Sequence, residues 1–392
     1  MVTTSNEELA RARFSTRSHG CDAVLLSSIA NVTYVSGFEV PFPLGASAEM
    51  AYGPTLALFS TRDSGSSGSW LIASRPNAAA AQQASRLDQV LVAEAFDASV
   101  DIDSQAAFVD TLRAALQAAG LSGIQATLGV EIRYLPFVAA SLLAKEFPKL
   151  TLVDVGAALQ DARLIKTERE IGLVRRASAI GDIGHQALAE LCHTSGSSEF
   201  AMWAELTSRM YRAVGHEIPI VGELVTGPRT CVVEYPAGPR ERITLAGDGA
   251  LMDISQRIDG YWSDCTNTHV IAAQATDHQK KYAKASQAAC EAAMDTLRVG
   301  KLASDASKAA EAAFAKFGLP MAHYTGHQLG VTVNELPRLV HHDHTPIKAG
   351  MVFAVEPGAY EGAGGTFGAR SEKIVLVTES GPEILSKFEW GI

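Results

Sequence analysis

The spacing of apolar residues in the first part of the chain predicts strands that alternate with helices. Short apolar runs, typical of buried strands, occur at 22–28, 55–59, 69–73, 126–131 and 151–155. Helical spacing is found at 7–19 and again at 108–119, where Gly120 ends it. Because the two kinds of segment alternate, we expect an α/β domain over residues 1–160.

The hydrophobic pattern changes after a boundary near residues 161–167. Helical spacing then appears in four segments, 168–191, 200–214, 278–297 and 304–317. Between and after them, from residue 221 onward, short strand-like runs dominate, which is typical of an α+β domain with antiparallel sheet. A chain of 392 residues is also too long for one typical core. We therefore predict two domains, residues 1–160 and 161–392.

Composition and charge exclude several classes of protein. Apolar residues make up 47% of the chain and the net charge is −10, with no basic stripe that would favour nucleic acid. No secretory signal and no apolar run of about 18 residues is found, so no membrane partner is expected. The five cysteines are scattered without a CxxC pair, as in reduced proteins. We expect a cytoplasmic protein.

Two aspartates flank a hairpin pattern in the second half. Asp253 and Asp264 lie on either side of Asp259-Gly260, a dipeptide that favours a two-residue turn. A tight hairpin places its arms side by side, so both carboxylates can reach one point. An exposed hairpin with two surface carboxylates is the alternative. Flanking apolar residues such as Met252 favour buried strands, and a buried carboxylate needs a partner or a metal.

Three further candidate ligands follow in the chain. His327 lies between glycines, which let the backbone turn tightly and approach a site closely, although a loop histidine is the alternative. Glu356 ends an apolar strand directly before Pro-Gly, and Glu372 opens another apolar strand. Both carboxylates are therefore expected at strand ends, where they would point into the space that the sheet encloses.

This set of side chains suits two adjacent divalent ions. Carboxylate oxygens with one imidazole fit Mn²⁺, Fe²⁺, Co²⁺ or Zn²⁺, and the set does not distinguish between them. Carboxylates can bridge two metals about 3.5–4 Å apart, and a water between the metals becomes a nucleophile. The sequence predicts a two-metal centre built from Asp253, Asp264, His327, Glu356 and Glu372.

These motifs, in this order, resemble the pita-bread metallohydrolases, which include methionine aminopeptidase, aminopeptidase P, prolidase and creatinase. Residues 20–38 resemble the creatinase-type N-terminal domain, and residues 163–171 resemble the family's linker. The resemblance covers nearly the whole chain. It implies a creatinase-like α/β N-terminal domain, an α+β pita-bread catalytic domain and a homodimer.

The resemblance also implies a role for each predicted ligand. Asp264 and Glu372 would bridge the two metals. Asp253 would complete one site, and His327 and Glu356 would complete the other. Creatinase works without metal and lacks this full set, so the intact set indicates a metalloenzyme.

The positions expected to face the substrate depart from the family pattern. Glu234 stands where the family's peptidases usually carry a histidine, and Asn334 stands where they carry a second one. Thr266-Asn-Thr replaces a usual Thr-Arg-Thr. Both missing histidines normally contact the substrate or its developing charge. The resemblance therefore implies a kept metal centre and a substrate other than a standard Xaa-Pro peptide.

Further residues are candidates for catalysis and substrate binding. His323 matches a substrate-facing position of aminopeptidase P, and Glu234 can act as an acid or base if a dry pocket raises its pKa. A supporting histidine and a surface carboxylate are the alternatives. Candidate substrate contacts are Asn334, Tyr235, Phe38 and Arg370, which precedes Glu372 by two residues as in the family.

The predicted function is hydrolysis of an amide or peptide-like C–N bond in a small molecule or dipeptide, by a hydroxide held between two metals. One alternative is a lyase resembling the branch that cleaves dimethylsulfoniopropionate, although Ser255 stands where that branch carries another acidic residue. An Xaa-Pro dipeptidase or aminopeptidase is another. A non-enzymatic binding module is the third, and the complete ligand set argues against it.

Overall fold

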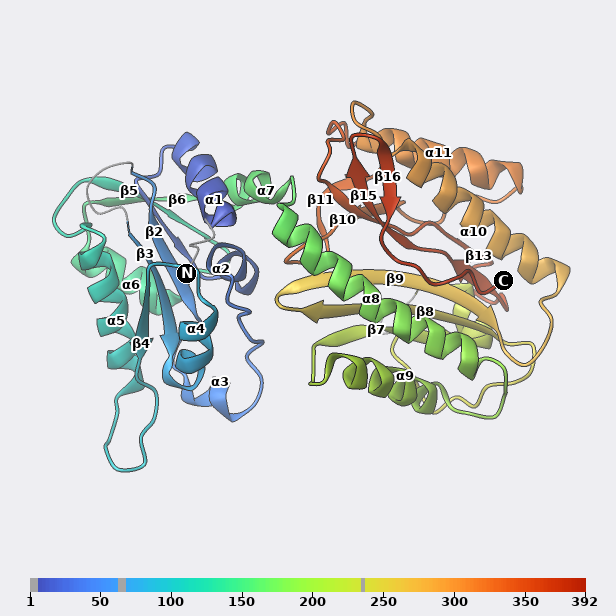
Figure 1. Cartoon of the computed structure of the whole chain (residues 1–392), viewed down its shortest axis with the longest axis horizontal. Coiled ribbons are helices and arrows are strands. Elements are labelled where there is room, and N and C mark those ends of the chain that lie inside the picture. Colours follow the sequence, from blue (N-terminus) through green and yellow to red (C-terminus); the bar gives the residue numbers. More distant parts are fainter. Residues whose placement is uncertain (1–5, 63–67, 234–236) are drawn as a thin grey trace. The chain divides into compact units, whose positions relative to one another are not determined.

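The computed structural model describes residues 6–62, 68–233 and 237–392. The chain divides into two compact units, Met1–Leu164 and Ile165–Ile392 (Figure 1). The division falls within the segment where the hydrophobic pattern changes. Among the helices of the described residues, none is long and apolar enough to cross a membrane.

A six-stranded mixed sheet forms the centre of the first unit, in the order β4-β3-β2-β1-β5-β6. β1 is antiparallel to β2, and β2 to β3, whereas the other neighbours are parallel. The strands are β1 (Ala23–Leu26), β2 (Leu56–Ser60), β3 (Ser69–Ser74), β4 (Gln89–Ala93), β5 (Ala126–Val130) and β6 (Leu150–Asp154). The helices are α1 (Glu7–Ser18), α2 (Ile29–Ser36), α3 (Ala46–Met50), α4 (Ala78–Ala84), α5 (Ser104–Ala118), α6 (Phe137–Glu146) and α7 (Gly156–Arg163).

Alternate strand residues explain how this sheet is packed. Leu25, Leu58 and Ile72 belong to one core cluster with Leu112 of α5 and Leu142 of α6. The intervening strand residues are buried as well, so both faces of the central strands are covered. The α/β fold expected for this part of the chain is confirmed.

Antiparallel sheets and four long helices make up the described part of the second unit. One sheet contains β7 (Ile220–Thr226), β8 (Gly249–Ile258) and β9 (Tyr261–Val270). A larger sheet has the order β11 (Glu335–Leu339), β10 (Gly326–Gln328), β12 (Val352–Val355), β15 (Lys373–Thr378) and β16 (Gly381–Ile384). The smallest pairs β13 (Gly358–Tyr360) with β14 (Gly368–Arg370). The helices are α8 (Glu168–Leu191), α9 (Glu199–Val214), α10 (Asp277–Thr296) and α11 (Ala303–Lys316).

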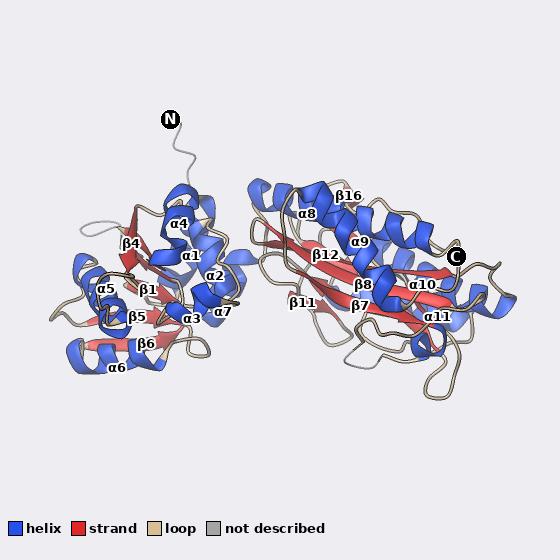
Figure 2. Ribbon diagram, turned by 90° about the horizontal axis from the view of Figure 1, so that it is seen from below, coloured by secondary structure: helices blue, strands red, loops and turns tan. Residues whose placement is uncertain are grey.

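Helices α8 and α9 pack against one face of the β7-β8-β9 sheet (Figure 2). Met252, Ile254 and Leu224 belong to the same core cluster as Leu188 of α8 and Leu206 of α9. Because side chains alternate along a strand, the odd-numbered residues of β8, Asp253 among them, point away from these helices. The metal ligand expected on β8, Asp253, therefore lies on the opposite face of the sheet.

The hairpin predicted between β8 and β9 is confirmed. Asp259 and Gly260 both have positive φ, 49° and 87°, as a two-residue type I′ turn requires. The register pairs Asp253 with Thr266 and Ser255 with Asp264. Asp253 and Asp264 are therefore diagonal neighbours on one face of the sheet.

A substitution in this turn tests its contribution to stability. Gly260→Ala forces a Cβ into the left-handed region, so we expect a loss of about 1–2 kcal/mol in the free energy of unfolding. Gly172→Ala is the matched control, because Gly172 lies exposed in α8 with no heavy atom within 4 Å of a built Cβ. That change should stabilise the helix by about 0.5–1 kcal/mol. Urea unfolding followed by circular dichroism measures both, and equal effects would contradict the proposed turn.

Candidate metal centre

Strands from different sheets position the five predicted ligands. Asp253 lies in β8, Asp264 in β9 and His327 in β10, whereas Glu356 directly follows β12 and Glu372 directly precedes β15. Two backbone hydrogen bonds fix the last two residues. The N–H of Glu356 donates to the carbonyl of Thr325 (2.8 Å), and that of Glu372 donates to the carbonyl of Thr266 (3.0 Å).

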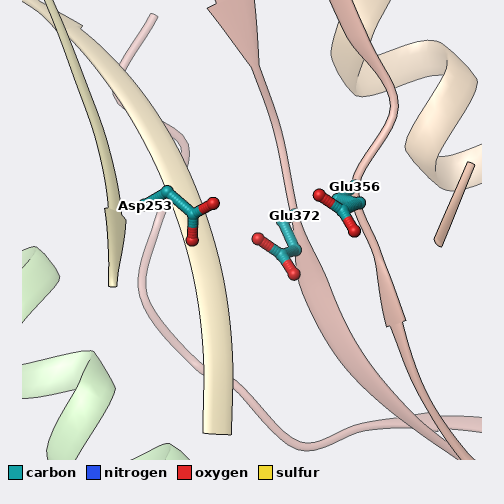
Figure 3. A group of neighbouring side chains, drawn as sticks. All are labelled: Asp253, Glu356 and Glu372. Atoms are coloured by element: carbon teal, nitrogen blue, oxygen red, sulfur yellow. The ribbon is translucent and has the colours of Figure 1, made fainter. Parts of the chain in front are cut away.

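The structure brings all five side chains together. Asp253, Glu356 and Glu372 each offer an oxygen within 4.8 Å of those of the other two, and their carboxylates face a shared space (Figure 3). Nε2 of His327 lies 3.2 Å from Oε1 of Glu356 and 3.7 Å from Oδ2 of Asp264. Residues distant in sequence thus form one cluster.

Hydroxyl and backbone partners hold these ligands in place. The Ser255 hydroxyl donates to Oδ1 of Asp264 (2.8 Å), and the Thr266 hydroxyl donates to Oε2 of Glu372 (2.7 Å). Nδ1 of His327 lies 2.9 Å from the carbonyl of Gln328 and donates to it. Nε2 of His327 is therefore the nitrogen that faces the carboxylates and can bind a metal.

Burial makes this cluster electrostatically unfavourable without a cation. Burial raises the pKa of Asp264 to about 7, helped by the charge of Glu356, and it raises those of Asp253 and Glu372 well above their usual range. For Glu356, burial also acts upward, but the hydrogen bond and charge of His327 outweigh it and lower its pKa. Such a cluster favours cation binding.

Two carboxylate oxygens of the cluster provide a direct test of whether metal ions fit. Oδ1 of Asp253 and Oε1 of Glu372 are buried and have no hydrogen-bond partner among the described residues. Buried carboxylate oxygens are normally satisfied by a donor or a metal. The donor set of carboxylates and one imidazole therefore fits divalent ions.

Arg370 forms a network behind Asp253. Its guanidinium is buried and donates to Oδ2 of Asp253 (2.6 Å) and Oε2 of Glu223 (2.8 Å). It also donates to the Thr266 hydroxyl (2.9 Å) and the Tyr360 hydroxyl (3.2 Å). Four of its five N–H groups are thus used within the protein. This arrangement indicates that Arg370 orients Asp253. The sequence had instead predicted that Arg370 contacts the substrate.

A cavity of about 370 Å³ lies beside this network. Its lining includes Glu223, Tyr360 and Arg370, together with Leu251 and Arg229. The volume lies in the range of small-molecule sites. A small substrate bound there would lie next to the residues that hold Asp253.

His323 lies near the same network. Its Nε2 is 3.3 Å from the Tyr360 hydroxyl, and its Nδ1 donates to the carbonyl of Tyr324 (2.8 Å). Burial lowers the pKa of His323, and the positive charge of Arg370 lowers it further. The imidazole is therefore neutral at neutral pH, with a lone pair on Nε2.

The structure does not place the other predicted substrate contacts beside the Arg370 network. Asn334 is exposed, and its Oδ1 accepts a hydrogen bond from Nε of Arg338 (3.2 Å). Phe38 belongs to the first unit and is 5% exposed. Glu234 and Tyr235 lie outside the described residues. The roles of these four residues remain predictions.

Sequence reasoning missed Glu223 and Tyr360. Glu223 is a carboxylate in the middle of a strand, and the register places it directly opposite Asp253. Its burial beside a second carboxylate is explained by Arg370, which bonds to both. A glutamate within the apolar run of β7 was the only pattern that pointed to it.

A pH titration tests the burial of Asp264. In the metal-free protein its folded-state pKa of about 7 exceeds the unfolded value of about 3.9. Between these values the folded state holds a proton that the unfolded state lacks, so stability falls as the pH rises from about 4 to about 7. Asp264→Asn removes this titration.

We therefore expect the variant to gain stability relative to the original protein as the pH rises, by a few kcal/mol at most. Urea unfolding in chelator at several pH values measures the difference. Asp277→Asn, at an exposed position, is the control for the effect of an Asp-to-Asn change outside the cluster. A difference for Asp264→Asn that does not change with pH would contradict the raised pKa.

Comparison with known proteins identifies the family of this chain. Residues 172–379 match the model of metallopeptidase family M24, and residues 9–165 match the creatinase/prolidase N-terminal domain. An Xaa-Pro dipeptidase from Pyrococcus furiosus is 30% identical over 247 residues, which cover 62% of this chain and 68% of that protein. A probable dipeptidase, PepE, from Mycobacterium tuberculosis is 33% identical over 226 residues, which cover 57% and 58% of the two chains.

The same fold is found in a solved structure. The prolidase from Pyrococcus horikoshii OT3 has a TM-score of 0.78 and 24% identity, and the match covers 98% of this chain and 99% of that one. The family and the two-domain pita-bread fold expected from the sequence are thereby confirmed. The chain belongs to metallopeptidase family M24, a family of metal-dependent hydrolases.

Proposed function

We propose that this chain is a dinuclear metal-dependent hydrolase that cleaves the C–N bond of a small amide or dipeptide. The proposal depends on one observation, the convergence of Asp253, Asp264, His327, Glu356 and Glu372 on a shared space. Membership of a metallopeptidase family supports it. A homodimer is proposed on the family resemblance alone.

The chain's own residues would hold and orient the metal ligands. Bound divalent ions would supply Lewis acidity, which acidifies a water molecule and polarises the substrate carbonyl. Arg370 holds Asp253 in one orientation, and the hydroxyls of Ser255 and Thr266 fix the neighbouring carboxylates. Such supporting bonds typically change metal affinity 10–100-fold when removed.

His323 is proposed to hold and return a proton during the reaction. Its neutral ring carries a lone pair on Nε2, so it can accept a proton and donate it to the leaving nitrogen. Glu234, predicted as a second acid–base group, lies outside the described residues. Its role is proposed from the sequence alone.

A dipeptide or similar small amide is the proposed substrate. The cavity beside Arg370 has the volume of a small-molecule site, and the named relatives are dipeptidases. By the family resemblance, Glu234 and Asn334 stand where peptidases of this kind usually carry histidines. For this reason we propose a preference that differs from the standard Xaa-Pro type.

Removing one ligand tests the metal-dependent function. Asp264→Ala deletes a proposed bridging carboxylate, so we expect about two transition-metal equivalents in the original protein and clear loss of metal and activity in the variant. Elemental analysis and a panel of dipeptides and small amides measure this. Asp277→Ala is the control and should keep both metal and activity.

Turnover in ¹⁸O-labelled water separates hydrolysis from elimination. A hydrolase places the label in the product carboxylate, whereas a lyase consumes no water. Preferential cleavage of Xaa-Pro dipeptides would contradict the proposed specificity and leave the hydrolytic function intact. A protein purified without stripping that holds no metal would contradict the proposed function itself.

The network behind Asp253 gives a second test. Arg370→Lys keeps the charge but loses the fork that reaches Asp253 and Glu223 together, so we expect a metal affinity roughly 10–100-fold lower. Arg240→Lys is the control, because Arg240 lines the same cavity but is exposed. Competition with a chromogenic chelator measures both affinities, and equal values would show that Arg370 does not position the ligand.

A further inference from the structure

A second and larger cavity, of about 600 Å³, lies in the second unit between α8, the end of β9 and residues 387–391. It shares no lining residue with the cavity beside Arg370. Apolar and aromatic side chains supply much of its wall, namely Ile183, Ala189, Val270, Phe388 and Trp390. The cavity is therefore separate from the proposed substrate site.

The outer wall of this cavity is fixed by hydrogen bonds. Oδ1 of Asp182 accepts the backbone N–H groups of Lys387 (2.8 Å) and Phe388 (3.2 Å). Oδ1 of Asn267 accepts the backbone N–H of Gly391 (3.2 Å). Residues 387–391 are thus held at both ends against α8 and β9, so the cavity is a built feature of the fold.

His185 on α8 presents a buried acceptor without a donor. Its Nε2 lies 3.1 Å from the carbonyl of Cys265, which can only accept, so Nε2 carries the proton. Burial lowers the pKa of His185 to about 3, so the ring is neutral and Nδ1 bears a lone pair. That Nδ1 is buried and has no hydrogen-bond partner among the described residues. The ring stacks on Phe388 with centroids 4.0 Å apart.

His269 on β9 presents the complementary group. Oδ1 of Asn267 accepts backbone N–H groups, which leaves its Nδ2 as the donor 3.2 Å from Nε2 of His269. Nε2 of His269 therefore accepts, and its Nδ1 carries the proton. Burial lowers the pKa of His269 to about 4, so this ring is neutral as well. The lining thus offers one acceptor and one donor without a charge.

The charged side chains that line the cavity are either exposed to solvent or already hydrogen-bonded within the protein. Lys387 and Glu389 are exposed, and Asp182 is bonded to the backbone. Nζ of Lys373 lies 3.4 Å from the ring centroid of Phe388 and 4.5 Å from that of Trp390, and it donates to the carbonyl of residue 388. An anion or a cation would find little inside the cavity to offset the loss of its hydration. A flat neutral molecule would lose less hydration and could pack against the aromatic side chains of the wall.

We propose that this cavity is a second ligand site, for a neutral planar molecule that carries an N–H or O–H donor beside a carbonyl acceptor, such as an aromatic amide or a lactam. The donor would satisfy Nδ1 of His185 and the carbonyl would accept from His269. The site also connects to the metal centre. His185 bonds to the carbonyl next to Asp264, and Lys373 follows Glu372. Both contacts lie next to proposed metal ligands in the sequence, although no lining residue is itself a proposed ligand.

A matched set of small probes tests the site on the intact protein. Benzamide supplies a ring, an N–H donor and a carbonyl. Benzoate is an anion, and N,N-dimethylbenzamide is neutral without a donor. We expect saturable binding of benzamide in titration calorimetry and ligand-observed NMR, and affinities roughly tenfold lower for the other two. Equal affinity for all three, or no saturable binding of benzamide, would overturn the proposal.

Variants locate the bound probe. His185→Phe removes the acceptor and keeps an aromatic ring, and Ala189→Phe fills the cavity from α8, so each should lower benzamide affinity at least about tenfold. Ala204→Phe, at an exposed position on α9 outside the lining, should change nothing. Asp264→Ala should keep the affinity, which separates this site from the metal centre. Loss of binding only in Asp264→Ala would place the probe at the metal centre and refute the second site.

Discussion

The second unit has to keep four carboxylates together in a largely buried space. They belong to Asp253, Asp264, Glu356 and Glu372, and the strands and hydrogen bonds around them serve this constraint. Burial and mutual repulsion disfavour their charged forms, as the raised pKa of Asp264 shows. Without bound ions, compensation comes from Arg370, His327 and a few hydroxyl and backbone donors. We expect the same imbalance to favour cation binding, because a bound cation would offset the electrostatic cost of burying these four carboxylates.

Antiparallel pairing meets this constraint with few residues. The type I′ turn at Asp259-Gly260 sets the register of one hairpin, and that register alone puts Asp253 and Asp264 on one face. Glu356 and Glu372 lie at strand ends, where their backbone N–H groups bond across to neighbouring segments. The strands thus keep the four carboxylates close together although their negative charges repel each other.

The sequence was sufficient where the information is local. The Asp-Gly turn and the alternation along β8 lie within a few residues, and they predicted the hairpin and the orientation of its aspartates. Strand β4 and helix α6 were missed, since β4 is half-exposed and α6 begins after a proline without a side-chain cap. Glu223 was missed because its partners depend on the register of β7 and on a distant arginine.

The alternation that builds the metal centre also determines what lies behind it. On β9, Asp264 faces the carboxylate cluster, so the side chain of Cys265 faces the other way. The backbone carbonyl of Cys265 accepts a hydrogen bond from His185 of α8. At the start of β15, Glu372 faces the cluster and Lys373 reaches the rings of Phe388 and Trp390. Two ligands thus have immediate neighbours that bind the wall of the second cavity.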